Sequence, residues 1–297
     1  MGLTILTPTY NRAEMLKNVY NSLLKQTDFS FQWLVIDDGS KDDTAAIMQQ
    51  IIDQHQASFS IEYYKKENGG KHTALNYAHP YIRFDWVTVL DSDDTLVERM
   101  VDTINKITNE YQNDQEIGWF AYLRGYTNDK PMGPEYQKNY DRTNYVAYMN
   151  NGRKGEVLDI YRTSVFKNYP YPQYTDERFV SESYLNIRAA VYGKYKMITV
   201  NDILYLADYQ EGGYTKEGRK LQLSSPKGHA DLWAPVCFKG FSLKQSIKGT
   251  WLHIAYALMG KQTVKEIINN HDQKWFVLLN IPFGYMIQII WKKKYQM

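Results

Sequence analysis

Residues 86–94 read Trp86-Val87-Thr88-Val89-Leu90-Asp91-Ser92-Asp93-Asp94, and this stretch predicts both the fold and the position of a ligand site. Its first five residues are β-branched, aromatic or aliphatic, which is typical of a strand buried on both faces. In open α/β sheets, ligands bind beyond the carboxyl ends of the strands, where Asp91, Ser92 and Asp93 would lie. We therefore expect this strand to end at a site rich in acid.

Three neighbouring carboxylates repel one another unless positive charge lies among them. Hard carboxylate oxygens suit Mg²⁺ or Mn²⁺, and a divalent ion shared with a diphosphate would satisfy this cluster. The alternative is a structural role, in which Asp93 or Asp94 caps the next helix and Glu98 lies in its first turn. The stretch by itself leaves both interpretations open.

Strands and helices alternate along the first hundred residues. Further strands are expected at 3–7, 31–36 and 61–64, each followed by apolar residues at helical spacing. Asn11 and Glu14 form a candidate capping box for the first helix. This alternation predicts an α/β fold: a mostly parallel central sheet, Rossmann-like, flanked by helices.

Polar residues follow each of the four expected strands. Because the carboxyl ends of parallel strands share one edge, these residues predict a common ligand site. Each also has a local alternative, such as an Asx turn at Asp37-Asp38 or a plain turn at Gly69-Gly70. The residues concerned are Tyr10, Asn11, Arg12, Asp37, Asp38, Asn68, Lys71, Asp91 and Asp93.

Four motifs in this order resemble those of family 2 glycosyltransferases. They are Thr7-Pro8-Thr9-Tyr10-Asn11-Arg12, Asp37-Asp38-Gly39-Ser40 with its following acidic run, Asn68-Gly69-Gly70-Lys71, and Asp91-Ser92-Asp93-Asp94. The resemblance covers roughly the first hundred residues. It implies a GT-A fold, a nucleotide-sugar donor, a divalent metal ion and inverting transfer.

The resemblance also implies residue roles. Asp38 would accept a hydrogen bond from a uracil-type base, Lys71 would lie near the diphosphate, and Asp91 and Asp93 would hold Mn²⁺ or Mg²⁺, with Asp93 the more direct ligand. The implied donor-binding residues are Pro8, Thr9, Tyr10, Arg12, Asp38, Asn68, Lys71, Asp91 and Ser92.

An inverting transferase needs a base to take the proton from the acceptor hydroxyl. Residues 179–188 resemble the acidic motif of the family, and alignment on Leu185 and Arg188 makes Glu182 the candidate catalytic residue. The motif departs from the family pattern because a serine replaces the neighbouring acid. Asp176 and Glu177 remain rivals, and Glu182 could instead serve only to cap its helix.

Length and composition limit the possible domain organisation, location and partners of the protein. The 297 residues allow a GT-A catalytic domain at 1–205, with a nucleotide-sugar half (1–115) and an acceptor half (116–205), and a mainly helical extension at 206–297. A single cysteine and no secretory signal pattern favour a cytoplasmic protein. A net charge of +2 does not indicate a nucleic-acid partner.

The tail at 275–294 is almost wholly apolar and ends in Lys292-Lys293-Lys294. This tail is too short and too interrupted to be expected to span a membrane. It suits instead an interfacial segment on the cytoplasmic face of an anionic membrane. Alternatively, it packs on the catalytic domain or on a second copy, as in a homodimer. A glycine-bearing loop at 205–214 resembles a family motif that closes near the donor.

The combined prediction is a metal-dependent inverting transferase. It would move a sugar from a nucleotide-sugar, with UDP favoured, to a hydroxyl of a saccharide or lipid-linked saccharide, in capsule, exopolysaccharide or lipopolysaccharide synthesis. One alternative is a sugar nucleotidyltransferase, although no glycine-rich phosphate loop follows the first strand. The other is a catalytically silent subunit that binds nucleotide-sugars or acts as a membrane scaffold.

Overall fold

The computed structural model describes residues 2–152, 155–207, 214–237 and 240–296. The glycines of the predicted donor-closing loop, Gly212 and Gly213, lie outside these ranges. The chain forms two compact units built from interleaved segments. The sheet unit comprises Met1–Thr143, Lys154–Pro170 and Tyr195–Glu211, and the helical unit comprises Asn144–Arg153, Tyr171–Lys194 and Gly212–Met297.

In the sheet unit, each of the strands β1, β2 and β3 is followed by a helix, whereas strands dominate from β6 onward. In chain order the elements are β1 (Leu3–Thr9), α1 (Ala13–Leu24), β2 (Phe31–Asp37), α2 (Thr44–Gln54), β3 (Ser60–Lys65), α3 (Lys71–Tyr77), the 3-10 turn His79–Tyr81, β4 (Trp86–Val89), β5 (Thr95–Leu96), α4 (Met100–Glu110), β6 (Ile117–Thr127), β7 (Lys130–Pro131), β8 (Asp141–Thr143), β9 (Val157–Arg162), α6 (Thr163–Asn168) and β10 (Lys196–Leu206).

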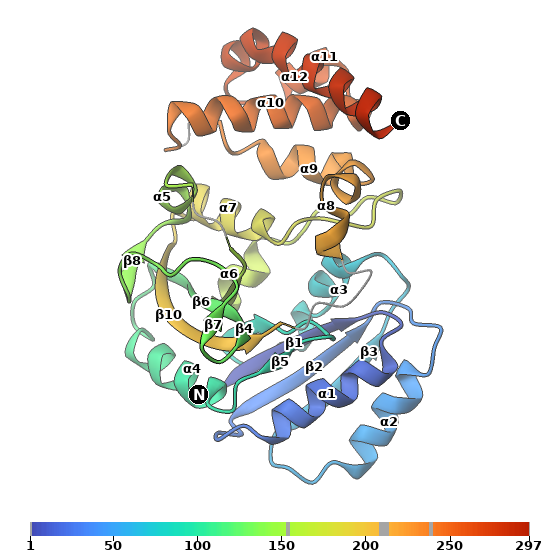
Figure 1. Cartoon of the computed structure of the whole chain (residues 1–297), viewed down its shortest axis with the longest axis vertical. Helices are drawn as coiled ribbons and strands as arrows, with labels where there is room; N and C mark the ends of the chain where they lie inside the picture. The colour runs from blue at the N-terminus through green and yellow to red at the C-terminus, as the bar shows by residue number, and fades with distance from the viewer. Residues whose placement is uncertain (1, 153–154, 208–213, 238–239, 297) are drawn as a thin grey trace. The chain divides into compact units, whose positions relative to one another are not determined.

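These strands form one mixed sheet in the order β3-β2-β1-β4-β9-β6-β10-β5; in addition, β7 pairs with β6 and β8 pairs with β10. The neighbouring strands β3, β2 and β1 can be followed in Figure 1. The first four strands are parallel, as predicted. Strand β9 runs antiparallel to both β4 and β6, so β6 and its parallel neighbour β10 point the same way as β1. The carboxyl ends of six strands therefore share one edge of the sheet.

Every residue of β1, β2 and β4 is buried, as expected for strands covered on both faces. Alternate residues such as Leu3, Ile5 and Trp33 pack in one core with α1, α2 and α4. Helix α3 contacts β1 and β2, and α6 contacts β4 and β9. The predicted α/β fold with helices flanking the sheet is confirmed.

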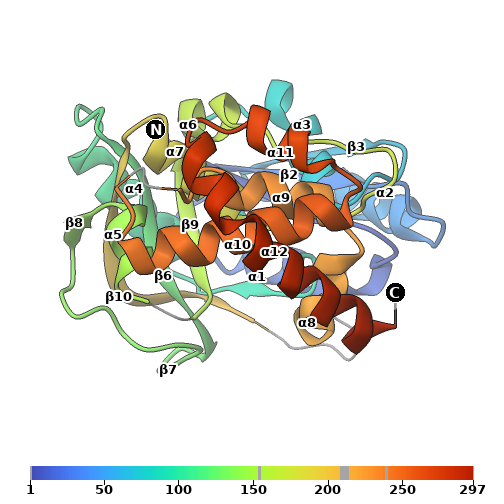
Figure 2. The ribbon, with the colours of Figure 1, turned by 90° about the horizontal axis from the view of Figure 1, so that it is seen from above.

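The helical unit contains α5 (Tyr145–Asn150), α7 (Ser183–Val191), α8 (Tyr214–Leu223), α9 (Pro226–Trp233), α10 (Leu243–Met259), α11 (Val264–Asn269) and α12 (Lys274–Tyr295). Helix α10 packs against α9 and α12, and the pair α10 and α12 can be followed in Figures 1 and 2. In the part of the chain that is described, none of the helices has the length and apolar character to cross a bilayer.

Candidate active site

The exits of β1 and β2 are joined by short polar contacts. The amide of Asn11 donates to Ser40 Oγ at 2.8 Å, and Asn11 Oδ1 accepts from the amide of Lys41 at 2.8 Å. The predicted capping box at Asn11 is wrong: Arg12 occupies the N-cap position of α1, and Glu14 pairs with Lys17. Asn11 instead adopts a left-handed backbone (φ 52°), which asparagine tolerates in turns.

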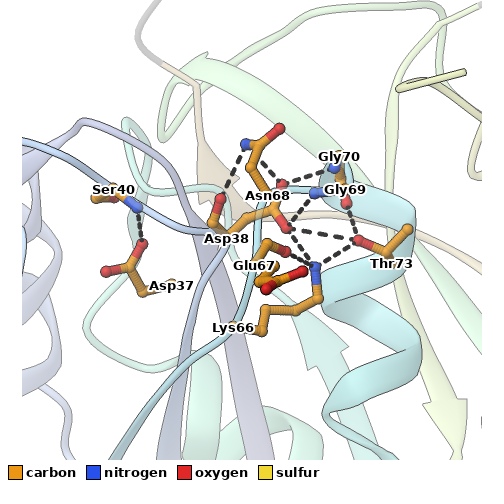
Figure 3. A network of polar contacts seen from close by, with 9 residues as sticks. All are labelled: Asp37, Asp38, Ser40, Lys66, Glu67, Asn68, Gly69, Gly70 and Thr73. Carbon is orange, nitrogen blue, oxygen red and sulfur yellow. Dashed lines mark hydrogen bonds and ion pairs between the residues drawn. The ribbon is translucent and has the colours of Figure 1, made fainter. Parts of the chain in front are cut away.

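Asp38 lies at the centre of a buried polar network between the exits of β2 and β3 (Figure 3). Its side chain accepts from Lys66 Nζ at 2.6 Å, from the Gly70 amide at 2.6 Å and from the Gly69 amide at 3.0 Å. Asn68 Nδ2 donates to the main-chain oxygen of Asp38 at 2.8 Å. The carboxylate predicted to read a base is thus engaged by donors of this chain, and it fixes the loop that leads into α3.

The neighbouring Asp37 is also turned inward. Its oxygens accept from the Ser40 amide at 2.7 Å and from the Tyr63 hydroxyl at 2.6 Å. Burial, followed by the charge and hydrogen bond of Asp37, raises the pKa of Tyr63, so this hydroxyl remains a donor. Asp37 therefore shapes the turn after β2.

The acidic cluster after β4 does not stand alone. Asp93 forms an ion pair with Arg12, which follows β1, and Asp91 forms an ion pair with Lys71, the first residue of α3. Burial alone would raise the pKa of Asp91, but Lys71 and Arg124 outweigh it and hold this pKa below its ordinary value. Each of the two aspartates thus faces a cation from another strand exit.

Asp94 has a structural role. It is buried and accepts from the Tyr205 hydroxyl at 2.6 Å, and the same hydroxyl accepts from the Asp91 amide at 3.1 Å. The proposed capping of the following helix is wrong, because β5 intervenes and Arg99 is the N-cap residue of α4. The Tyr205 contact instead fixes the backbone at Asp91.

The sequence did not indicate Arg124, which lies near the carboxyl end of β6 and is 9% exposed. Its guanidinium lies 3.6 Å from Asp91 and stacks over the Tyr205 ring at 4.2 Å, while Nε donates to the Val157 carbonyl. The one signal available was a charged residue inside an otherwise apolar strand. Lys66 was likewise missed, because its partner Asp38 lies 28 positions away.

The remaining predicted residues lie at the same strand exits. Pro8 and Thr9 are buried at the end of β1, whereas Tyr10 is 43% exposed, so its ring is accessible for stacking on a base. Ser92 is buried between Asp91 and Asp93. The sheet unit thus brings Arg12, Lys71, Asp91 and Asp93 into two ion pairs, with Arg124 beside one of them.

The two carboxylates of Asp91 and Asp93 suit a divalent ion that is also coordinated by a bound ligand. Among the described residues, no group of three or more His, Cys, Asp or Glu side chains is arranged to hold an ion alone. Mg²⁺ is usually bound by one or two carboxylates together with substrate phosphates. Asp91 and Asp93 fit that second arrangement, and the cations beside them fit the phosphates.

Glu182 and its rivals belong to the helical unit. Glu182 occupies the N-cap position of α7, and its side chain makes no capping hydrogen bond there. Glu177 is buried and accepts from the amides of Lys227 at 2.6 Å and Gly228 at 2.8 Å, so it caps α9. Burial raises the pKa of Glu177 despite these two hydrogen bonds. Asp176 pairs with Lys227 at 2.8 Å.

The α/β sheet with flanking helices has the GT-A fold, which this chain shares with solved glycosyltransferase structures. A family model described as "Glycosyl transferase family 2" matches residues 4–170, more than half of the chain. The chain therefore belongs to glycosyl transferase family 2.

Curated relatives agree with this assignment. An uncharacterised glycosyltransferase of Mycoplasma genitalium is 25% identical over 96% of this chain and 91% of its own length. A homologue from Mycoplasma pneumoniae is 35% identical over 42% of each chain. Glycosyltransferase GlyA of Streptococcus pneumoniae is 25% identical over 72% of this chain and 31% of its own length.

Solved structures show the same fold at low sequence identity. The structure of S. aureus TarS in complex with UDP has a TM-score of 0.59 at 15% identity, over 91% of this chain and 78% of that chain. Mannosyltransferase PcManGT from Pyrobaculum calidifontis, in complex with GDP-Man and Mn²⁺, has a TM-score of 0.59 at 15% identity, over 97% and 86%.

Proposed function

We propose that this chain transfers a sugar, with inversion, from a UDP-linked donor to an acceptor hydroxyl, with Mn²⁺ or Mg²⁺ as cofactor. The observation that carries the proposal is the pair of ion pairs, Lys71 with Asp91 and Arg12 with Asp93, at the edge where parallel strands end. The TarS structures with UDP and UDP-GlcNAc support a UDP-linked donor. PcManGT, which binds GDP-Man and Mn²⁺, supports a divalent ion.

The ion pairs suggest how the donor is bound. A diphosphate offers Arg12, Lys71 and Arg124 more negative charge than a single carboxylate does, so these cations turn toward the phosphates. Asp91 and Asp93 would then be the residues that hold the metal ion. When bound, this ion neutralises the charge that develops on the departing nucleoside diphosphate.

Glu182 is proposed as the base. As the acceptor oxygen attacks the anomeric carbon, its proton passes to the Glu182 carboxylate, and the electron pair of the broken C–O bond leaves with the diphosphate. The assignment depends on the motif that ends in Leu185 and Arg188. The contacts of its rivals support it, because Glu177 caps α9 and Asp176 is paired with Lys227.

The acceptor is proposed to be a saccharide or lipid-linked saccharide of capsule, exopolysaccharide or lipopolysaccharide synthesis. A cytoplasmic location and a homodimer also remain predictions. Family membership argues against the nucleotidyltransferase alternative. The silent-subunit alternative differs in a measurable way, because it predicts donor binding without turnover.

A UDP-release assay tests the proposed activity. The protein is incubated with Mn²⁺, a panel of UDP-hexoses and UDP-N-acetylhexosamines, and saccharide acceptors. Replacing Glu182 by Gln should lower kcat by about 100-fold or more, because a general base contributes 10²–10⁴-fold, and should leave the Kd for UDP unchanged. Asp176→Asn is the control, since this exposed carboxylate forms an ion pair with Lys227.

Two results would contradict the assignment. One is full activity in Glu182→Gln with activity lost in Asp176→Asn, which would exchange their roles. The other is tight UDP binding by the wild type with no UDP release from any donor and acceptor, which would favour the silent subunit. Proton NMR of the product would show whether the anomeric configuration is inverted.

A further inference from the structure

Helix α12 exposes a mainly apolar face, which is unusual for a helix that borders water. The inward face, toward α10, buries Asn280, Gly284 and Gln288 together with Val277. The outward face exposes large apolar side chains at spacings of three and four residues: Trp275, Leu278, Leu279, Phe283, Tyr285, Met286, Ile289 and Ile290, of which Trp275 is 79% and Leu279 71% exposed.

Specific contacts fix this orientation. Asn280 Oδ1 accepts from Trp251 Nε1 at 2.7 Å, and Asn280 Nδ2 donates to the Phe276 carbonyl at 2.8 Å, so the buried amide is satisfied. Gly284 approaches α10 so closely that a Cβ there would lie 2.5 Å from the Ile254 side chain. Turning the helix to bury its apolar face would break these contacts, so the outward face is a stable feature.

Helix α10 continues the apolar surface. The Trp251 ring stacks on Phe283 with centroids 5.1 Å apart. Beside it lies an open hollow of about 530 Å³ lined by Leu243, Lys244, Ile247, Lys248 and Trp251, where Leu243 is 61% exposed. We call the exposed residues of these two helices the α10/α12 face; Figure 2 shows the two helices crossing one another.

The charge on these helices is of one sign. Helices α10 and α12 contain no Asp or Glu. Their six lysines are Lys244, Lys248, Lys274, Lys292, Lys293 and Lys294. A surface that combines exposed Trp, Tyr and aliphatic side chains with lysines matches the boundary between lipid headgroups and acyl chains.

We propose that the α10/α12 face docks on a bilayer that contains anionic lipids, with its apolar side chains at the acyl boundary and its lysines against lipid phosphates. A second copy of this chain is a poorer occupant. A twofold dimer places the same patch on both partners, so lysines would face lysines. The proposal concerns attachment and stands independently of the proposed transfer reaction.

Vesicle flotation of the full chain tests the docking. We compare vesicles of phosphatidylcholine alone with vesicles of equal parts phosphatidylcholine and phosphatidylglycerol. The protein should float with the anionic vesicles, and added salt should weaken the binding. Replacing Lys292, Lys293 and Lys294 by Gln should lower the partition coefficient by about 100-fold at low salt, because each lysine contributes roughly fivefold near an anionic surface.

A second variant, with its own control, tests the contribution of the exposed apolar side chains to vesicle binding. Leu279→Asp combined with Ile290→Asp places charge on two exposed positions, so the fold should be retained, as checked by circular dichroism and thermal melting. This variant should lose vesicle binding at least tenfold. The control Leu24→Asp changes an exposed leucine of α1 in the sheet unit and should bind as the wild type does.

Several outcomes would overturn the proposal. These are no flotation of the wild type with anionic vesicles, equal binding to both vesicle types, or unchanged binding by the Leu279→Asp and Ile290→Asp variant. Light scattering adds another test. A dimer that the same variant abolishes, together with no vesicle binding, would assign this face to a second copy.

Discussion

Among single residues, Asp38 shows how a predicted ligand can hold a loop in place. The residue is 3% exposed, and its carboxylate accepts hydrogen bonds from the Lys66 ammonium and from two glycine amides. Asp38→Asn removes the negative charge and leaves Lys66 partly buried without its ion pair. We expect the free energy of unfolding to fall by about 3 kcal/mol, because breaking a buried pair leaves an uncompensated charge.

Urea denaturation measures this loss. Asp129→Asn is the matched control, because Asp129 is exposed and its side chain accepts from Thr127. That substitution should change stability by less than about 0.5 kcal/mol. If both variants unfolded at the same urea concentration, the structural role of Asp38 would be wrong.

The residues at the strand exits could be predicted because parallel strands bring their carboxyl ends together. The ion pairs between these residues could not be predicted, since partners such as Arg12 and Asp93 are 81 positions apart in the chain. The place of Arg124 in the site could not be predicted for a related reason. Its position beside Asp91 depends on β9, which lies in the sheet between β4 and β6. Asn11 was misassigned because a turn conformation competes with capping at such residues.

At the scale of elements, the helical unit contains two histidines that resist protonation. Burial lowers the pKa of His229 to about 4 and that of His253 to about 4. Each Nδ1 lies within hydrogen-bond distance of a carbonyl oxygen, of Ser225 and Ala230 respectively. The folded state therefore prefers neutral imidazoles where the unfolded chain takes up protons.

Because the folded pKa lies below the unfolded value of about 6.5, this stability is complete above pH 6.5 and is lost as pH falls through 4. At pH 5 the loss should reach about 2 kcal/mol for each histidine. Urea midpoints at pH 7.5 and pH 5 measure it. His253→Gln should reduce the difference between the two midpoints. A wild-type midpoint that stayed constant would contradict this prediction.

Elements were predictable where hydrophobic pattern and turn residues agreed. The strands β1 to β4 and the helices between them follow from apolar runs and helical spacing. Strand order could not be read from the sequence, because β9 enters the sheet from a distant segment. The orientation of α12 could not be read from the sequence either, since its buried face holds Asn280 and Gln288 beside Val277, while many of its large apolar residues are exposed.

In the whole molecule, each of the two compact units is built from separate segments of the chain. The boundary near residue 205 stays a prediction, whereas the compact units interleave segments such as 144–153 and 171–194 with 212–297. Interleaving arises when distant segments pack together, and no local composition marks it. The α/β class and the helical character after residue 213 could be predicted, because both depend on periodicity within each segment.

Calorimetry tests the proposal that Asp91 and Asp93 hold a divalent ion shared with a UDP-linked donor. UDP is titrated into the wild type and Asp93→Asn, with and without Mn²⁺. Asp102→Asn is the control, because Asp102 is an aspartate of α4 that pairs with Lys106. We predict metal-dependent UDP binding by the wild type and the control, weakened at least tenfold in Asp93→Asn. If UDP bound equally well without Mn²⁺, and if Asp93→Asn left its affinity unchanged, the proposed metal site would be wrong.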